Sequence, residues 1–257
     1  MSAVVRQLSS TDAEAQEWQL RCDMAAVFRI AARLNWNEQI GNHNSLMLPR
    51  AAHDDRPLFL INPRGYRFEE LTASNLIVCD LDGNVVRGKG ELRKVAFHIH
   101  APIHLRNPGA ACIIHVHPQY LTAIAMLRNP ELALAHYNNL YLNDRVAIDV
   151  GGEKPVGDLS EGDRIANLLG DKTILLMASH GVTVVGPTVA DAFDECSWAE
   201  RTAMYQVTAM STGQPLRQLP ESGRRRFNGA WGDMVDAALH LASWRRILDR
   251  EEPDYAT

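Results

Sequence analysis

Apolar residues recur at helical spacing in several long segments and gather in short runs between them. From about Ala13 to Leu34 they return every three or four residues, which predicts an amphipathic helix. Further helices are expected over residues 91–106, 118–127, 160–169, 188–210 and 230–248. Short apolar runs predict strands at residues 58–61, 76–79, 85–86, 110–117, 145–150, 172–178 and 182–185. The stretch 35–49, rich in Asn, is expected to be a loop or an irregular strand.

Strands and helices alternate along the whole chain, and no linker is long enough to mark a domain boundary. Pro102 predicts a kink in the helix 91–106, and Thr188 is expected to cap the helix that follows it. The pair Asp82-Gly83 indicates a hairpin turn. We therefore expect an α/β protein in which one domain, residues 1–257, packs helices on a mixed sheet.

Composition excludes several classes of protein. The 257 residues carry 26 Lys and Arg against 31 Asp and Glu, a formal net charge of −5. This balance argues against a nucleic-acid surface, and the densest basic run, Arg224–Arg226, is short. No stretch is apolar and long enough to span a membrane, and residues 1–19 do not resemble a signal peptide. We expect a cytoplasmic protein.

Histidine is the unusual residue type, with ten copies against four cysteines. The cysteines lie far apart among apolar residues, so we expect buried free thiols and no zinc cage. His115 and His117 flank Val116 at the end of an apolar run, and alternate residues of a strand point to the same side. Two imidazoles on one side form a ready pair of metal ligands, although two surface histidines would give the same pattern.

A catalytic metal site needs a third protein ligand, and His180 is the candidate because it follows an apolar strand in a Ser-His-Gly turn. His100 and His104 are four residues apart and share one helix face, whereas His98 points elsewhere. This pair is interpreted either as packed residues that support metal ligands or as a second pair of ligands. The zinc-protease pattern is not met, because no Glu lies between them.

The order of these motifs resembles the class II aldolase and adducin family. The resemblance runs from about Asp23 to Gly213. It rests on Ile40-Gly41-Asn42-His43-Asn44-Ser45, on residues 59–65 followed by 71–76, on Asn107-Pro108-Gly109 before His115-Val116-His117, and on Ser179-His180-Gly181. The combination is far more specific than any one piece. The resemblance covers a core at about residues 23–213, so we expect residues 218–257 to form a C-terminal helical extension.

The resemblance implies a three-layer α/β/α domain with a largely antiparallel central sheet. It also implies a divalent metal cation (Zn, Mn, Fe or Co) on His115, His117 and His180. The early loop suggests substrate contacts from Asn42, His43 and Asn44, and the family's approach to substrate near residue 62 adds Asn62. Members often form cyclic tetramers with sites between subunits, so a homotetramer acting on a small molecule is expected.

One departure from the family puts its proton-transfer acid in doubt. The sugar-phosphate aldolases place a Glu about four residues before a helix histidine, and here that position holds Ala96 before His100. Glu91 is the nearest acid. The early loop also replaces the small residues that cradle phosphate with His43 and Asn44. A substrate that carries a carboxylate or a phenol is therefore expected in place of a phosphorylated sugar.

Three functions follow from this resemblance. The first is a metal-dependent carbon–carbon lyase, a decarboxylase or retro-aldolase, which acts on a small hydroxylated aromatic or keto acid through a metal-stabilised enolate. Decarboxylation needs only a later proton, which Glu91, His100 or Tyr141 could supply. The second is a non-heme iron oxygenase on the same fold. The third is a non-catalytic scaffold like adducin, which lacks the full histidine set that is present here.

Overall fold

The computed structural model describes residues 10–49, 56–107, 109–151, 159–222 and 236–257. Eight strands form one sheet in the order β4-β3-β2-β1-β5-β8-β7-β6. All neighbouring strands pair antiparallel except β6 and β7, which are parallel. The strands are β1 (His43–Met47), β2 (Leu58–Ile61), β3 (Ile77–Asp80), β4 (Val85–Arg87), β5 (Cys112–Val116), β6 (Val146–Asp149), β7 (Ile174–Met177) and β8 (Gly181–Gly186).

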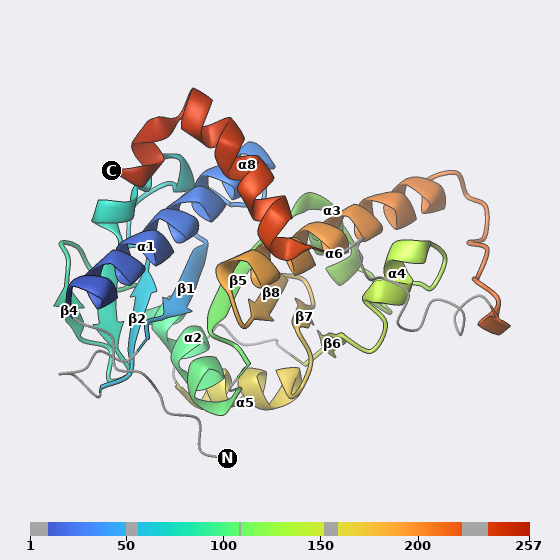
Figure 1. Cartoon of the computed structure of the whole chain (residues 1–257). Helices are drawn as coiled ribbons and strands as arrows, with labels where there is room; N and C mark the ends of the chain where they lie inside the picture. Colours follow the sequence, from blue (N-terminus) through green and yellow to red (C-terminus); the bar gives the residue numbers. More distant parts are fainter. Residues whose placement is uncertain (1–9, 50–55, 108, 152–158, 223–235) are drawn as a thin grey trace, which may run out of the picture.

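Helices lie on both faces of the sheet (Figure 1). They are α1 (Ser10–Arg33), α2 (Lys94–Arg106), α3 (Gln119–Ala125), α4 (Tyr137–Tyr141), α5 (Leu159–Leu169), α6 (Val189–Met210) and α8 (Ala237–Glu251), with short 3₁₀ helices at Phe68–Glu70, Ala73–Asn75 and Pro253–Ala256. No helix among these described ranges is both long and apolar enough to cross a membrane. The basic run Arg224–Arg226 lies outside the described residues.

The alternation of side chains along each strand places separate apolar cores on the two faces of the sheet. In β5, Cys112, Ile114 and Val116 pack toward α1, α3 and α6, whereas Ile113 packs toward α2 and α5. Helices α2 and α5 contact each other extensively on that second face. The result is the three-layer α/β/α arrangement with a largely antiparallel sheet that the family resemblance implies. His115 shares the face of Ile113, so it points toward the layer of α2.

Most predicted elements are confirmed within a few residues, although the start of the predicted helix 230–248 lies outside the described residues, and the exceptions have a physical reason. The stretch expected to be a loop or irregular strand contains β1, a regular strand between β2 and β5. His43, Asn44 and Ser45 are all buried there, one after another. Polar residues on both faces of a strand remove the alternation that marks a half-buried strand. Helix α4 falls in a segment too polar and aromatic to show helical periodicity.

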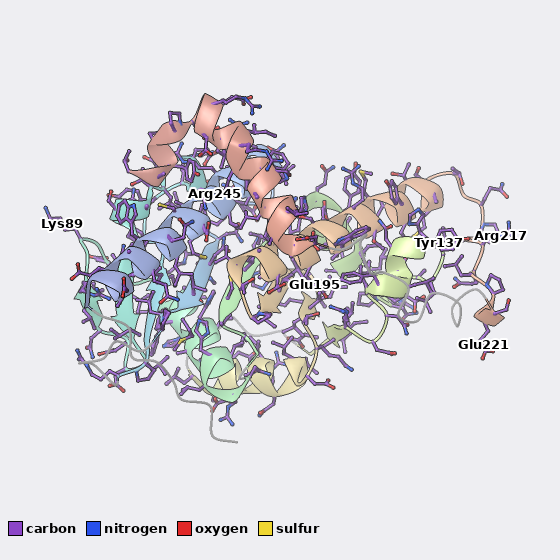
Figure 2. All side chains as sticks on the ribbon, viewed as in Figure 1. Lys89, Tyr137, Glu195, Arg217, Glu221 and Arg245 are labelled. Atoms are coloured by element: carbon purple, nitrogen blue, oxygen red, sulfur yellow. The ribbon has the colours of Figure 1, made fainter. Side chains whose placement is uncertain are left out.

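The C-terminal helix is tied to α1 by charged side chains. Arg245 of α8 donates to Asp23 of α1, and Figure 2 labels Arg245 where the two helices meet. Arg29 is only 7% exposed, and it donates to the Leu71 carbonyl at 2.9 Å, to Glu252 at 3.0 Å and to Asp254 at 2.7 Å. A buried guanidinium with three acceptors therefore joins α1 to the end of the chain.

Replacing Arg29 with Ala should lower the free energy of unfolding by about 1–3 kcal/mol, because it leaves the buried Leu71 carbonyl without its donor and removes one donor each from Asp254 and from Glu252, which Arg33 still contacts. Urea unfolding followed by circular dichroism measures this change. Arg67→Ala is the control, since its side chain is 53% exposed and, among the described residues, forms an ion pair with Glu69 alone; it should cost less than about 0.5 kcal/mol. Equal losses in the two variants would refute the assignment.

Candidate metal centre

Strand pairing at the middle of the sheet places the first ligand candidates. His115 lies opposite His43 of β1 and opposite Thr183 of β8. His117 follows directly after β5 and points to the same side, and its backbone N–H donates to the Trp36 carbonyl at 2.8 Å. The spacing of two residues therefore carries both imidazoles to one end of the strand, as the sequence predicts.

His180 arrives from the tight turn between β7 and β8. Ser179 adopts a left-handed backbone (φ 56°), and the His180 N–H donates to the Met177 carbonyl at 3.1 Å. Gly181 allows the close approach, because a Cβ atom there would collide with the His117 ring and with the carbonyl of Val116. The ring nitrogens of His115, His117 and His180 come within 4.8 Å of one another. These three histidines are called the triad below.

Hydrogen bonds decide which ring nitrogen faces the centre of the triad. His115 Nδ1 lies 3.1 Å from Thr183 Oγ1, and that hydroxyl donates in turn to Met177 Sδ at 3.4 Å. The hydroxyl has one proton, so it accepts from His115 Nδ1–H and leaves Nε2 bare. His117 Nδ1 donates to Glu38 at 2.7 Å, whereas its Nε2 is buried with no partner among the described residues.

This donor set fits a divalent cation. An unpartnered buried nitrogen is costly unless something accepts its lone pair, and a metal ion does so. Burial lowers the pKa of His115 well below its usual value and also lowers that of His180, so both rings are neutral and can bind a metal. The Glu38–His117 contact is the carboxylate–histidine pairing that commonly orients a metal-bound imidazole.

The three Asn residues expected to touch substrate brace the backbone around the triad. Asn62 Oδ1 accepts from Asn44 N at 3.2 Å, and its Nδ2 donates to the Asn42 carbonyl at 3.2 Å. Asn44 Oδ1 accepts from His115 N at 3.1 Å, and Asn42 Oδ1 accepts from Glu38 N at 2.5 Å. Their carbonyl oxygens are thus occupied in positioning β1 and β5, so substrate contact by these residues stays a proposal.

The expected proton carriers lie in three different places. His100 is fully buried, and both of its ring nitrogens contact side chains, His43 and Ser45. Glu91 is on the loop before α2 and pairs with Arg64 at 3.4 Å, with its side chain 78% exposed. Tyr141 belongs to the opposite layer, where Arg145 covers its ring at 4.4 Å and burial raises its pKa to about 12.

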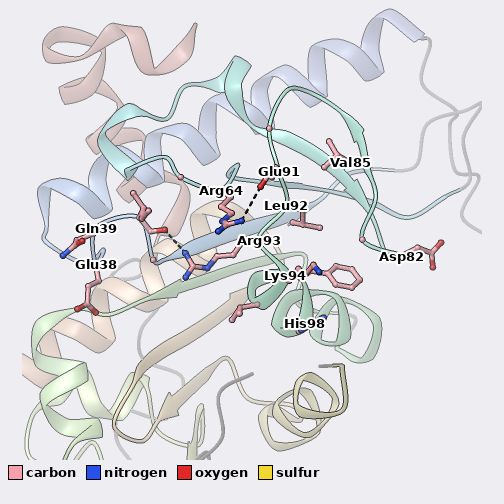
Figure 3. Close-up of a pocket in the computed structure, with 17 residues that line it drawn as sticks. Glu38, Gln39, Arg64, Asp82, Val85, Glu91, Leu92, Arg93, Lys94 and His98 are labelled. Carbon is pink, nitrogen blue, oxygen red and sulfur yellow. Dashed lines mark hydrogen bonds and ion pairs between the residues drawn. The ribbon is translucent and has the colours of Figure 1, made fainter. Parts of the chain in front are cut away.

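A cavity of about 1390 Å³ lies near the triad, although none of the three histidines lines it (Figure 3). Glu38, the partner of His117, forms part of its wall, and Phe97 contributes an apolar surface. Three cationic side chains, Arg64, Arg93 and Lys94, also line it. Figure 3 shows the two arginines on neighbouring segments, with Arg64 paired to Glu91 and Arg93 bonded to a backbone carbonyl. Three acids, Glu38, Asp82 and Glu91, balance these cations, so any preference for an anion depends on Arg93, whose bond is to a neutral carbonyl.

Comparison with known proteins identifies the family of this chain. A family model described as the Class II Aldolase and Adducin N-terminal domain matches residues 22–207. The chain therefore belongs to the class II aldolase and adducin family. Class II aldolases typically use a divalent metal, and the triad is a possible site for one.

Relatives and solved structures of this family cover nearly the whole chain. A Caulobacter vibrioides protein whose name assigns it to class 2 of the aldolases is 33% identical over 245 residues, which are 93% of each chain. The crystal structure of an aldolase II superfamily protein from Pseudomonas syringae shares 28% identity and a TM-score of 0.85, with 100% of both chains covered. L-fuculose 1-phosphate aldolase from Glaciozyma antarctica PI12 shows the same fold, with 23% identity, a TM-score of 0.82 and coverage of 97% and 96%.

Sequence reasoning missed two partners of the triad in this class II aldolase family member. Glu38 is 79 residues from His117 along the chain, in a turn with no periodic signal. Thr183 lies in the middle of an apolar strand and is separated from His115 by 68 residues. Only the pairing of β8 with β5 could have identified Thr183, because it is the one hydroxyl in β8 and lies opposite a histidine.

Removing the Glu38 carboxylate should weaken zinc binding by about 10- to 100-fold, because His117 loses the acceptor that orients its ring. We expect Glu38→Ala to show this loss in a competition titration against a zinc chelator, and Glu38→Gln, which keeps an acceptor, to lose less. The matched control is Glu91→Ala, which removes another acid from the same cavity wall. A similar loss in Glu91→Ala would show that the general charge of the cavity matters and the single hydrogen bond does not.

Proposed function

We propose that this protein is a divalent-metal-dependent carbon–carbon lyase, a decarboxylase or retro-aldolase, acting on a small hydroxylated aromatic or keto acid. The observation that carries the proposal is the convergence of three imidazoles within 4.8 Å, near a cavity that shares Glu38 with the surroundings of His117 and contains Arg93. Three protein ligands leave a coordination position for substrate, as in catalytic metal sites. A divalent cation there acts as a Lewis acid toward negative charge that develops on a substrate oxygen.

The residues of the cavity account for an acidic substrate. Arg93 donates to the Ile40 carbonyl at 3.0 Å, and no described acid forms an ion pair with it. The guanidinium keeps other N–H groups for a carboxylate, which it can bind with two parallel hydrogen bonds. Arg64 is less available because it pairs with Glu91. Phe97, in the same wall, offers an apolar surface to the rest of the substrate.

The residues available for proton transfer favour a bond cleavage that does not require a strong base on α2. Ala96 is fully buried and packs against Phe59 and Ile77, so no carboxylate enters the site from that position. Of the three expected proton carriers, Glu91 lines the cavity, and we propose it as the group that delivers the proton. His100 is proposed to act through His43, since it is enclosed. Tyr141 lies on α4 beside Arg145, and we propose that it serves the triad of a neighbouring subunit in a cytoplasmic homotetramer.

Turnover on a panel of acids tests the reaction class. The chain loaded with Mn²⁺, Co²⁺ or Zn²⁺ should release carbon dioxide or an aldehyde from at least one hydroxylated aromatic or keto acid. His117→Ala should abolish both metal binding and turnover and leave the circular dichroism spectrum unchanged, because only the end of β5 is altered. Full metal occupancy in His117→Ala, or oxygen uptake without cleavage by the wild type, would contradict the proposal.

Substituting Arg93 should act on substrate binding more than on the chemical step. Arg93→Ala is expected to raise KM for the acid by roughly 10- to 100-fold, the size of one charge-assisted hydrogen bond, with a smaller change in kcat. Arg64→Ala is the matched control, and it should change KM less because Arg64 is already paired with Glu91. A larger effect at Arg64 would indicate that Arg64, and not Arg93, binds the carboxylate.

A further inference from the structure

A line of hydrogen bonds runs from α2 through β1 to the edge of the triad. His104 Nδ1 lies 2.8 Å from the Ala110 carbonyl oxygen, and His104 Nε2 lies 2.8 Å from Ser45 Oγ. The same hydroxyl contacts His100 Nδ1, and His100 Nε2 lies 2.8 Å from His43 Nδ1. His43, Ser45 and His100 are at most 3% exposed. The line is therefore enclosed by protein along most of its length.

The Ala110 carbonyl sets the direction of these bonds. A carbonyl oxygen only accepts, so His104 Nδ1 must carry a proton and donate it. Burial lowers the pKa of His104 to about 4, so its ring is neutral at pH 7 and its Nε2 accepts. Ser45 gives its single hydroxyl proton to His104, and it therefore accepts from His100 Nδ1–H.

The same direction passes on to His43. Burial lowers the pKa of His100 well below its usual value, so this ring is also neutral and its Nε2 accepts. His43 must then donate from Nδ1; the residue is 3% exposed and no described carboxylate contacts it, so a charged imidazolium is disfavoured and Nε2 is bare. The opposite direction would set a bare His104 nitrogen against the Ala110 oxygen, two acceptors in repulsion.

His43 presents this bare nitrogen beside the triad. Its ring stacks on His115 with centroids 4.8 Å apart, and the charge of Arg93 in the neighbouring cavity acts on it. Its Nε2 has no hydrogen-bond partner among the described residues, and it is not one of the enclosed polar atoms. A hydrogen-bond acceptor is thus held ready where a substrate would meet the metal ligands.

We propose that the His104–Ser45–His100 line fixes His43 Nε2 as an acceptor that binds a substrate hydroxyl, so that the site selects hydroxy acids over keto acids. The identity of the ligand as an acid rests on the proposed function above. A keto group has no proton to donate, and its oxygen would face the lone pair of His43. His43 is the residue that touches the substrate, whereas His104, Ser45 and His100 are positioning residues that act through it.

The tautomers can be read directly in the intact chain. Long-range ¹H–¹⁵N spectra of histidine-labelled protein at pH 7.5 should show His43, His100 and His104 protonated on Nδ1 and bare on Nε2. Free imidazole side chains favour the other tautomer, so this pattern would not arise by default. A proton on Nε2 of His43 in the wild type would overturn the proposal.

Cutting the line at Ser45 tests its effect on selectivity. In Ser45→Ala, His100 Nδ1 loses its acceptor, so His100 should move its proton to Nε2 and donate to His43. His43 would then carry its own proton on Nε2 and become a donor. The Kd ratio of benzoylformate to mandelate, a keto acid and its hydroxy counterpart, measured by calorimetry on zinc-loaded protein, should fall about 10-fold or more relative to wild type.

Ser45→Thr is the matched control, because it retains the hydroxyl and should keep both the tautomers and the ratio of the wild type. An unchanged ratio in folded, zinc-loaded Ser45→Ala would overturn the proposal. If Ser45→Ala does not fold, the wild-type tautomers still decide. Absence of lyase turnover on every acid would count against the proposed function alone, since tautomers and binding ratios are measured without turnover.

Discussion

The register between β1, β5 and β8 is the constraint on which the site depends. It places His43, His115 and Thr183 side by side on three adjacent strands. A slip of one residue would turn every side chain of a strand to the opposite face and separate the triad from its partners. The packed cores on the two faces oppose such a slip, because it would exchange buried apolar side chains between layers. The core that stabilises the sheet therefore also aligns the imidazoles.

Around the triad, outer partners determine the chemical state of the rings. Thr183 and Glu38 occupy the Nδ1 atoms of His115 and His117, which leaves the Nε2 atoms free to bind a cation. Burial supplies the second condition, because it keeps the rings neutral and so able to coordinate. Turn geometry supplies the third, since only glycine at position 181 lets His180 and His117 approach each other. Thr183, Glu38 and Gly181 shape the site, although none of them is a proposed metal ligand.

The fold and the convergence of the three histidines could be predicted from the sequence, whereas the supporting residues could not. Apolar runs predict seven of the strands, and the spacing of His115 and His117 by itself indicates a shared face. The stretch that holds β1 is expected to be a loop or irregular strand, because its consecutive polar residues are buried against side chains from distant elements. Glu38 and Ser45 contact their partners across 79 and 55 residues, and no local pattern encodes such contacts.

X-ray absorption at the zinc edge of the zinc-loaded chain tests the central claim most directly. One zinc per chain should show a first shell of nitrogen and oxygen at about 2.0–2.1 Å, with the multiple-scattering signature of three imidazoles. The four cysteines are free and buried, and none belongs to the triad. A sulfur shell at about 2.3 Å, or a signature of fewer than three imidazoles, would contradict the assignment of His115, His117 and His180 as the metal ligands.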